Sequence, residues 1–399
     1  MQKRNIFIIL LAITLIFTIP SQAMKVNTGG MVDSYLEVNN DGIQNKYNSL
    51  TELNIKLDTG TFDYTVYLDG SILLNQSNIK SLNQFSLDTE FKLNKLYFNY
   101  WYPQGKLKIG KQRIAWGSGY FFNPTDIINP LKETQKGEMN PRQATNSIYW
   151  NYYLGKGRLE GILVTEFQTL GPEINSEATA LVKGINSNLI GEVNLPKEFN
   201  EEKEFALRYS TLFYNYDLAI QYYKGREDYP VQKINYEDKK VIIDYPKKDV
   251  IGVNAAGTLG NVGIWGEATY SRPKIGGDYL QAIVGTDYTF ENGIHLLGEY
   301  FLDDSFSNFF PGTEIDVEEF IGVSTDYSLT DFIKVRGSYM KPLNSDVYLI
   351  NGEVSYSINQ NTEFKAVLNR LENESNTIFA EGNSMFPSDK ISLKMTYYY

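Results

Sequence analysis

The chain has 399 residues and a formal net charge of -11, with 42% hydrophobic and 14% aromatic residues. It contains no Cys and one His, which excludes disulfides, thiolate zinc sites and iron–sulfur clusters and argues against His-based metal sites. The acidic balance argues against nucleic-acid binding, and a mean hydropathy of -0.33 excludes a bundle of membrane-spanning helices.

The N-terminal segment, residues 1–23, has the parts of a secretory signal peptide. A basic pair precedes an apolar run from Ile6 to Ile19, which is short for a membrane span, and small residues end the segment at Ala23. We therefore expect cleavage after Ala23, export from the cytoplasm, and a mature domain over residues 24–399.

Beyond the signal segment, hydrophobic and polar residues alternate in one stretch after another. In 49–58, Leu53, Ile55 and Leu57 share one face, and polar residues occupy the positions between them. A period of two predicts β-strands, because successive strand side chains point to opposite faces. The same alternation recurs in the segments 61–69, 84–102 and 347–357.

Tight turns and longer polar connections follow one another along the chain. Eight short turns such as Gly260-Asn261 join neighbouring segments into hairpins, and nine longer connections separate the hairpins. The count predicts about 18 strands, or 16 as the alternative, provided that 84–102 is one strand with a bulge near Asn94. Short periplasmic turns and long extracellular loops are typical of an outer-membrane barrel.

The stretch from Gly110 to Pro130 differs from a freely solvated loop. It is rich in Gly, Pro and aromatic residues, and Gly and Pro restrict the conformations available to the backbone. Strict alternation from Ile109 would send Lys111 toward lipid. We therefore expect a bulge at Gly110 or a position at the extracellular rim.

Residues 390–399 form the last predicted strand, which alternates like the others and ends on Tyr399. A terminal aromatic residue resembles the C-terminal signature of outer-membrane barrel proteins, although Phe is the usual residue. The resemblance implies that Tyr399 is an assembly signal recognised by the barrel-assembly machinery.

These patterns predict an all-β fold, a single closed antiparallel transmembrane β-barrel in the lipid of the cell outer membrane. A sheet in hydrocarbon has to close, because every backbone polar group must be paired internally. Tyrosines near strand ends suit the aromatic girdles at the two membrane interfaces. Those predicted to face outward are Tyr222, Tyr270, Tyr288, Tyr300, Tyr327, Tyr339, Tyr356, Tyr397 and Tyr399.

The stretch from Gly110 to Pro130 also resembles the motif G-[KR]-Q-x-x-x-W-G followed by D-[VI]-[IN]-x-P of bacterial outer-membrane porin-like families, related broadly to alginate-export-type barrels. The resemblance extends over residues 95–131. Since the third loop of porins commonly folds into the lumen, it implies that residues 115–145 form a constriction loop. The residues expected to position this loop are Trp116, Gly117, Asn129 and Pro130. The charges expected at the constriction are Lys111, Arg113, Asp126, Lys132, Glu133, Glu138 and Arg142.

Arg113 and Asp126 have two possible roles, an ion pair that pins the loop to the wall or a contribution to the field of the constriction. The Gly and Pro residues around both favour pinning.

A barrel of 16 to 18 strands leaves an aqueous channel. Charged residues that face inward either line this channel or pair with charges on neighbouring strands. Those predicted to face the lumen include Glu52, Lys56, Asp63, Asp69, Asp88, Glu90, Arg208, Glu299, Lys334, Arg336, Lys365, Lys390 and Lys394.

The sequence thus predicts an outer-membrane porin, a passive diffusion channel for small hydrophilic solutes or ions, with no cofactor and no metal. The excess of acid predicts a weak cation preference. An adhesive or structural barrel that binds through loops 168–203 and 225–248 is the alternative. A barrel enzyme is disfavoured, because His295 is the single His and no Ser lies in a nucleophile motif. The oligomeric state stays open between a homotrimer and a monomer.

Overall fold

The computed structural model describes residues 25–40, 45–60, 63–77, 88–130, 142–168, 190–194, 203–228, 231–235, 240–305, 319–343, 346–372 and 390–399. Among these residues no helix is long and apolar enough to cross a bilayer. The strands are β1 (Lys25–Asn40), β2 (Asn45–Gly60), β3 (Tyr64–Ser77), β4 (Asp88–Tyr102), β5 (Gly105–Gln112), β6 (Thr145–Leu154), β7 (Gly157–Val164), β8 (Ile190–Asn194), β9 (Glu204–Phe213), β10 (Tyr216–Arg226), β11 (Val231–Asn235), β12 (Lys240–Asp244), β13 (Lys247–Leu259), β14 (Val262–Pro273), β15 (Tyr279–Thr289), β16 (His295–Asp303), β17 (Glu319–Ser328), β18 (Ile333–Pro342), β19 (Tyr348–Asn359), β20 (Thr362–Glu372) and β21 (Lys390–Tyr398).

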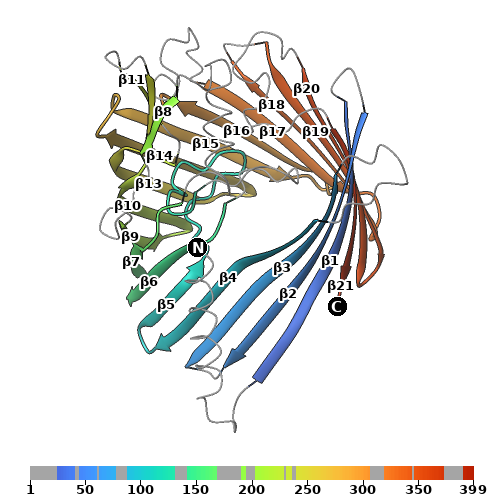
Figure 1. Cartoon of the computed structure of the whole chain (residues 1–399), viewed down its shortest axis with the longest axis horizontal. Coiled ribbons are helices and arrows are strands. Elements are labelled where there is room, and N and C mark those ends of the chain that lie inside the picture. The colour runs from blue at the N-terminus through green and yellow to red at the C-terminus, as the bar shows by residue number, and fades with distance from the viewer. Residues whose placement is uncertain are drawn as a thin grey trace.

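An 18-stranded antiparallel sheet closes on itself and forms the barrel (Figure 1). Each strand of this sheet pairs with its neighbours along the chain, and β1 pairs with both β2 and β21. At the seam, the N–H of Gly30 donates to the carbonyl of Tyr399 at 3.2 Å, and the N–H of Tyr399 donates to the carbonyl of Gly30 at 3.1 Å. The predicted closed barrel of 18 strands is confirmed.

Alternation along each strand produces an apolar outer face and a more polar inner face. On β9, Phe205, Leu207 and Tyr209 are exposed on the outside, whereas Ala206 is buried on the inside. Exposed apolar residues on this outer face suit contact with lipid. The predicted girdle tyrosines that are exposed on the outer face are Tyr270, Tyr327, Tyr356, Tyr397 and Tyr399.

The predicted bulge in β4 is present and preserves the strand count. Asp69 of β3 is opposite Lys95 and the next residue of β3 is opposite Leu93, so that Asn94 has no partner in the ladder. The Asn94 side-chain amide donates to Asp69 Oδ1 and Ser71 Oγ, each at 3.2 Å. The extra residue is therefore held by the inner face of β3, and the strand continues past it.

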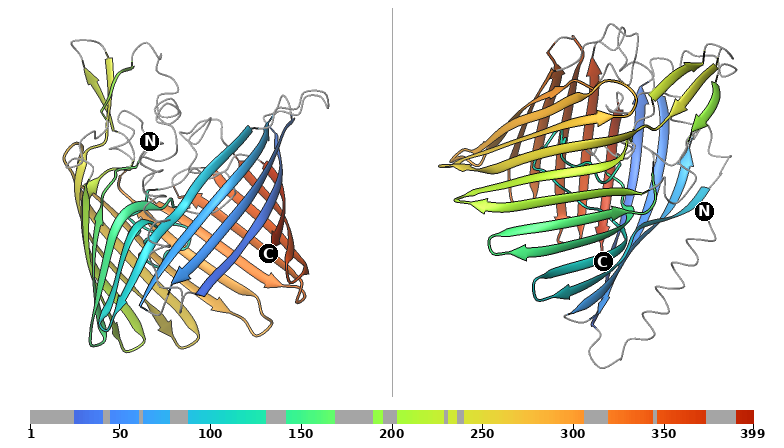
Figure 2. Two further views of the ribbon diagram at one scale, coloured as in Figure 1. Left: turned by 60° about the horizontal axis from the view of Figure 1, so that its bottom comes forward. Right: turned by 90° about the vertical axis from the view of Figure 1, so that its left-hand side faces the viewer.

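The tight turns and the two ends of the described chain lie at one end of the barrel (Figure 2). Strands β8, β11 and β12 form a separate three-stranded sheet at the other end, in which β8 and β12 are parallel. The sequence predicted only loops in 168–203 and 225–248. These strands were missed because their runs of five residues are too short to suggest a membrane-spanning strand.

Candidate functional site

The connection between β5 and β6 lies against the inner wall of the barrel. On β14, Tyr270 and Arg272 are exposed outside, whereas Glu267 and Ser271 are buried on the opposite, inner face. Residues 113–130, which we call the inner loop, contact Glu267 and lie within the ring of strands in Figure 1.

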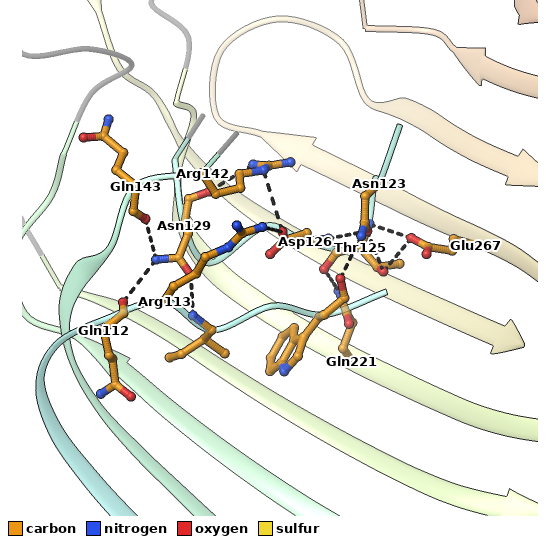
Figure 3. Close-up of polar contacts among 12 residues, drawn as sticks. Gln112, Arg113, Asn123, Thr125, Asp126, Asn129, Arg142, Gln143, Gln221 and Glu267 are labelled. Carbon is orange, nitrogen blue, oxygen red and sulfur yellow. Dashed lines mark hydrogen bonds and ion pairs between the residues drawn. The ribbon is translucent and has the colours of Figure 1, made fainter. Parts of the chain in front are cut away.

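The Glu267 carboxylate is one of two wall acids that hold the inner loop (Figure 3). Its Oε1 accepts hydrogen bonds from the backbone N–H of Ser118 and, at 2.9 Å, from that of Gly119. Its Oε2 accepts from the Thr125 hydroxyl at 2.6 Å and from the Thr125 N–H at 3.2 Å. Glu267 is only 4% exposed, so these loop donors satisfy an acid that would otherwise be costly to bury.

The Glu299 carboxylate on β16 holds the tip of the inner loop in the same way. It accepts hydrogen bonds from the backbone N–H of Tyr120 at 3.2 Å, of Phe121 at 2.7 Å and of Phe122 at 3.4 Å. The indole N–H of Trp265 donates to it at 3.2 Å. Two neighbouring hairpins of the wall thus bind consecutive parts of the loop.

Aromatic contacts reinforce this attachment at the loop tip. The Phe122 ring stacks on Phe301 of β16 with centroids 4.1 Å apart, and it also contacts Phe320 of β17 at 5.3 Å. Phe121 covers Gly322 of β17, where a Cβ would come within 2.6 Å of the ring. Aromatic pairs of this kind contribute about 0.5–1.5 kcal/mol beyond the area that they bury.

Gly117 has a left-handed backbone and lies so close to the wall that a side chain would clash there. Its φ of +79° lies in the left-handed region, which costs an L-residue about 1–2 kcal/mol. A Cβ at this position would lie 2.6 Å from Glu267 Oε1 and would overlap Asn123 Oδ1 and Thr125 Oγ1. The glycine therefore permits the loop backbone to approach the wall acid.

Asp126 forms the predicted ion pair with Arg113 and a second one with Arg142. The distances from Asp126 Oδ2 are 3.6 Å to the Arg113 guanidinium and 3.8 Å to that of Arg142. Burial raises the pKa of the Asp126 carboxyl, while the two guanidiniums act in the opposite direction. Asp126 is 2% exposed, so its charge acts on its loop partners rather than on the open lumen.

Asn129 connects the two ends of the β5–β6 connection. Its Oδ1 accepts from the Ile114 N–H at 2.7 Å, and its Nδ2 donates to the Gln143 carbonyl at 2.8 Å and to the Gln112 carbonyl at 3.4 Å. The Arg142 guanidinium donates to the Asn129 carbonyl at 3.0 Å. The fully buried Asn129 side chain thus supplies hydrogen bonds to the backbone where β5 and β6 no longer pair with each other.

We expect Asn129→Ala to lower the thermal stability of the purified protein. The substitution removes the acceptor of the buried Ile114 N–H, at about 1–3 kcal/mol for a buried group left unsatisfied. Thermal unfolding in detergent measures the loss, with Gln360→Ala in the exposed β19–β20 turn as the control. Equal unfolding temperatures for the two variants would contradict the bracing role.

The structure separates the remaining residues predicted at the constriction. Lys111 does not reach the inner loop, because its Nζ donates to the Leu93 carbonyl of β4 at 2.6 Å. Trp116 of the inner loop is buried, and the Arg208 guanidinium of β9 lies 5.5 Å from its indole centroid. The Pro130 carbonyl accepts from the Gln143 N–H at 3.0 Å. Three predicted charges lie outside the described residues, Lys132, Glu133 and Glu138.

Several predicted lumen charges form ion pairs across the inner wall. Lys394 of β21 lies 3.2 Å from Asp33 of β1, and Lys365 of β20 lies 3.4 Å from Glu353 of β19. Asp69 accepts from Asn94 in the bulge. Glu90 lies 3.8 Å from Lys92, and Lys334 and Arg336 are exposed on β18. For four predicted positions only the backbone is described, Glu52, Lys56, Asp88 and Lys390.

Three of the residues predicted to line the lumen do not face open water there. Asp63 lies in the exposed turn before β3, because the strand begins at Tyr64 and not at residue 61. Glu299 and Arg208 do face inward, but the inner loop covers them. The alternation of the sequence identified their face correctly and could not reveal the loop that packs on it.

Two lysines of β5 face the lumen over aromatic rings. Lys108 Nζ lies 3.8 Å from the centroid of Tyr97, and Lys106 Nζ lies 5.5 Å from that of Tyr149. Within the described part of the chain, neither forms an ion pair with an acid. A cation on an aromatic face is stabilised by the ring, which holds each ammonium group at the inner wall.

The described residues contain no group of three or more His, Asp or Glu that could hold a metal ion. His295 lies between two acids, with Nε2 2.8 Å from Asp287 Oδ2 and Nδ1 3.3 Å from Asp326 Oδ1. Since both ring nitrogens are engaged, the geometry provides no free base for a hydroxyl nucleophile.

No protein-family model matches the sequence, and no curated protein matches it. Solved structures do match, among them outer-membrane porins of the Occ/OprD family. OccK5 (OpdH) of Pseudomonas aeruginosa is 10% identical and has a TM-score of 0.56 over 94% of this chain and 98% of its own. OccAB3 of Acinetobacter baumannii is 11% identical, with a TM-score of 0.55 over 94% and 99%.

A further match is OccK2 (OpdF) of Pseudomonas aeruginosa in complex with glucuronate, which is 9% identical and has a TM-score of 0.54 over 94% of this chain and 99% of its own. The finer resemblance to alginate-export-type barrels gains no support from these matches. At such low identity the likeness concerns architecture, and in architecture this chain is similar to the outer-membrane porin barrels of the Occ/OprD family.

Proposed function

We propose that the protein is a passive diffusion channel for small hydrophilic solutes in a bacterial outer membrane. The observation that carries the proposal is the inner loop, which Glu267 and Glu299 hold inside a closed barrel of 18 strands. A barrel of this size leaves an aqueous lumen, and a loop fixed within it narrows the path. Flux then follows the concentration gradient and requires no catalytic group.

The inner wall favours anionic solutes, in particular small carboxylates. Lys106 and Lys108 present cationic groups to the lumen, whereas the acids Asp126, Glu267 and Glu299 are bound to arginines or to the inner loop. The total charge of the chain is thus a poor guide to its selectivity. The matching porin OccK2 was crystallised with glucuronate, which makes this sugar acid a suitable first solute.

A planar bilayer experiment tests the channel and its preference. We expect discrete conductance steps, inhibition of the ionic current by glucuronate, and a shift of the reversal potential toward cations in the variant Lys106→Gln/Lys108→Gln. The control Lys224→Gln/Lys247→Gln removes two charges from the outer face. Absence of conductance would contradict the channel, and equal reversal potentials for both variants would contradict the role of the inner lysines.

Export and assembly complete the proposal. Residues 1–23, which lie outside the described residues, serve as a cleaved signal peptide, and the exposed Tyr399 at the barrel seam serves as the assembly signal.

The oligomeric state, homotrimer or monomer, requires a separate measurement of mass in detergent. The sheet of β8, β11 and β12 at the extracellular end favours an adhesive role as the second candidate, which a barrel without conductance would support.

A further inference from the structure

A cluster of cations lies on the outer surface of the barrel, at the extracellular ends of three adjacent strands. It consists of Lys224 on β10, Lys247 on β13, Arg272 on β14 and Lys274 immediately after β14, and all four are exposed. We call these residues the outer cationic patch. They take no part in the lumen or in the attachment of the inner loop.

The side chains of the patch point away from the lumen. Lys224 alternates with Tyr223, which is buried on the inner face, and Arg272 alternates with the buried Ser271. Lys247 is followed by Lys248, whose Nζ reaches the inner-face residue Glu227 at 2.8 Å. Because neighbours on a strand point to opposite faces, the patch belongs to the face that carries the apolar band.

Among the described residues, Asp249 is the acid that lies between the strands of the four cations. Asp249 of β13 is directly opposite Lys224 on one side and Arg272 on the other, and Lys274 Nζ lies 3.7 Å from its Oδ2. The Tyr222 hydroxyl donates to Asp249 Oδ1 at 2.6 Å and uses part of its acceptor capacity. The patch therefore has a net positive charge, spread over strands that are about 4.8 Å apart.

Two further acids lie along this rim, Asp278 just before β15 and Glu319 on β17, and with Asp278 counted beside Asp249 the four cations still leave a net positive charge. The Tyr270 hydroxyl donates to Asp278 at 2.6 Å, and the Tyr300 hydroxyl donates to Glu319 at 2.8 Å. These tyrosines mark the interface between the apolar band and the extracellular loops, where aromatic residues of barrels gather. The patch thus lies at the level of lipid headgroups and not in hydrocarbon.

Like charges on neighbouring strands destabilise a sheet, and an external anion that binds all of them removes this cost. At the headgroup level of the outer leaflet, the anion at hand is the phosphate of a lipid. Arg binds phosphate through two parallel hydrogen bonds, and Lys supplies compact positive charge. We propose that the outer cationic patch binds the phosphate groups of an outer-leaflet lipid.

Lipid titration of the purified full-length protein in nonionic detergent tests the proposal. The probes are diphosphorylated lipid A, the same lipid without its phosphates, and inorganic phosphate, and the readouts are the unfolding temperature and bound lipid in native mass spectra. We expect lipid A alone to bind and to raise the unfolding temperature. The variant Lys224→Gln/Lys247→Gln/Arg272→Gln/Lys274→Gln should bind it at least about tenfold more weakly.

Controls separate a lost site from a lost fold. Lys156→Gln, in the turn at the opposite end, should bind lipid A like the parent, and the half-patch variant Lys247→Gln/Lys274→Gln should fall between parent and full variant. Heat-dependent migration in gels shows that each barrel is folded. Equal binding of the dephosphorylated lipid, unchanged binding by the full variant, or equal stabilisation by inorganic phosphate would each overturn the proposal.

Discussion

Replacing Gly117 with alanine is expected to release the inner loop and to raise the single-channel conductance. The added Cβ would lie 2.6 Å from Glu267 Oε1 and would overlap Asn123 Oδ1 and Thr125 Oγ1. The substitution also costs about 1–2 kcal/mol for a left-handed L-residue. Since the clash falls on the bonds between loop and wall, the loop should leave Glu267 while the barrel itself stays closed.

Gly155→Ala is the matched control for this experiment. Gly155 also has a left-handed backbone, with a φ of +58°, but a Cβ there meets nothing within 4 Å. The control thus carries the same backbone strain without the clash. Gly117→Ala should show larger and more variable conductance steps and admit larger solutes in liposome swelling. Conductance equal to that of Gly155→Ala would contradict the view that close contact at Gly117 seats the loop.

The second large effect is expected from Glu267→Ala/Glu299→Ala, which removes both wall acids. Each carboxylate accepts several hydrogen bonds from the inner loop, and a bond to a charged group contributes about 1.5–3 kcal/mol. Losing both should unseat the loop almost completely, so that conductance rises and the discrimination between small and large solutes falls. Each single variant should give an intermediate result.

Glu353→Ala distinguishes the loss of loop contacts from the loss of any inner acid. Glu353 faces the lumen on β19 and lies 3.4 Å from Lys365, with no hydrogen bond to the inner loop among the described contacts. Its removal should change ion selectivity and leave the size limit intact. An unaltered size limit in Glu267→Ala/Glu299→Ala would mean that the loop keeps its place without the wall acids.

The barrel was predictable because the interactions that form it connect residues close to each other in the sequence. Alternation assigns the faces of each strand, turn chemistry joins neighbouring strands, and the count of connections fixes the number of strands. Even the bulge at Asn94 follows from the requirement that residues 84–102 remain one strand. The motif around Gly117 and Asp126 likewise indicated that this loop has a fixed conformation.

The attachment of the loop was not predictable, because it depends on contacts between distant parts of the sequence. The alternation assigned Glu299 to the inner face, yet the loop partners of Glu267 and Glu299 lie 142 to 179 residues away along the chain. Alternation reveals the face of the strand on which a carboxylate lies, but it does not reveal which backbone N–H groups bind that carboxylate. For the same reason, a charge count predicted cation preference, whereas the structure shows that several acids are already bound within the protein.

The sequence separation of these contacts also has a consequence for the order of folding. Hairpin contacts close short stretches of chain, whereas the bonds of the inner loop to Glu267 and Glu299 connect segments far apart. Long-range contacts form late, because the chain must first lose the entropy of the intervening segment. The loop can therefore seat only after β14 and β16 have joined the wall. Seating of the loop is therefore expected to follow the assembly of this part of the wall, and a barrel whose loop has not yet seated should have a wider aperture than the mature channel.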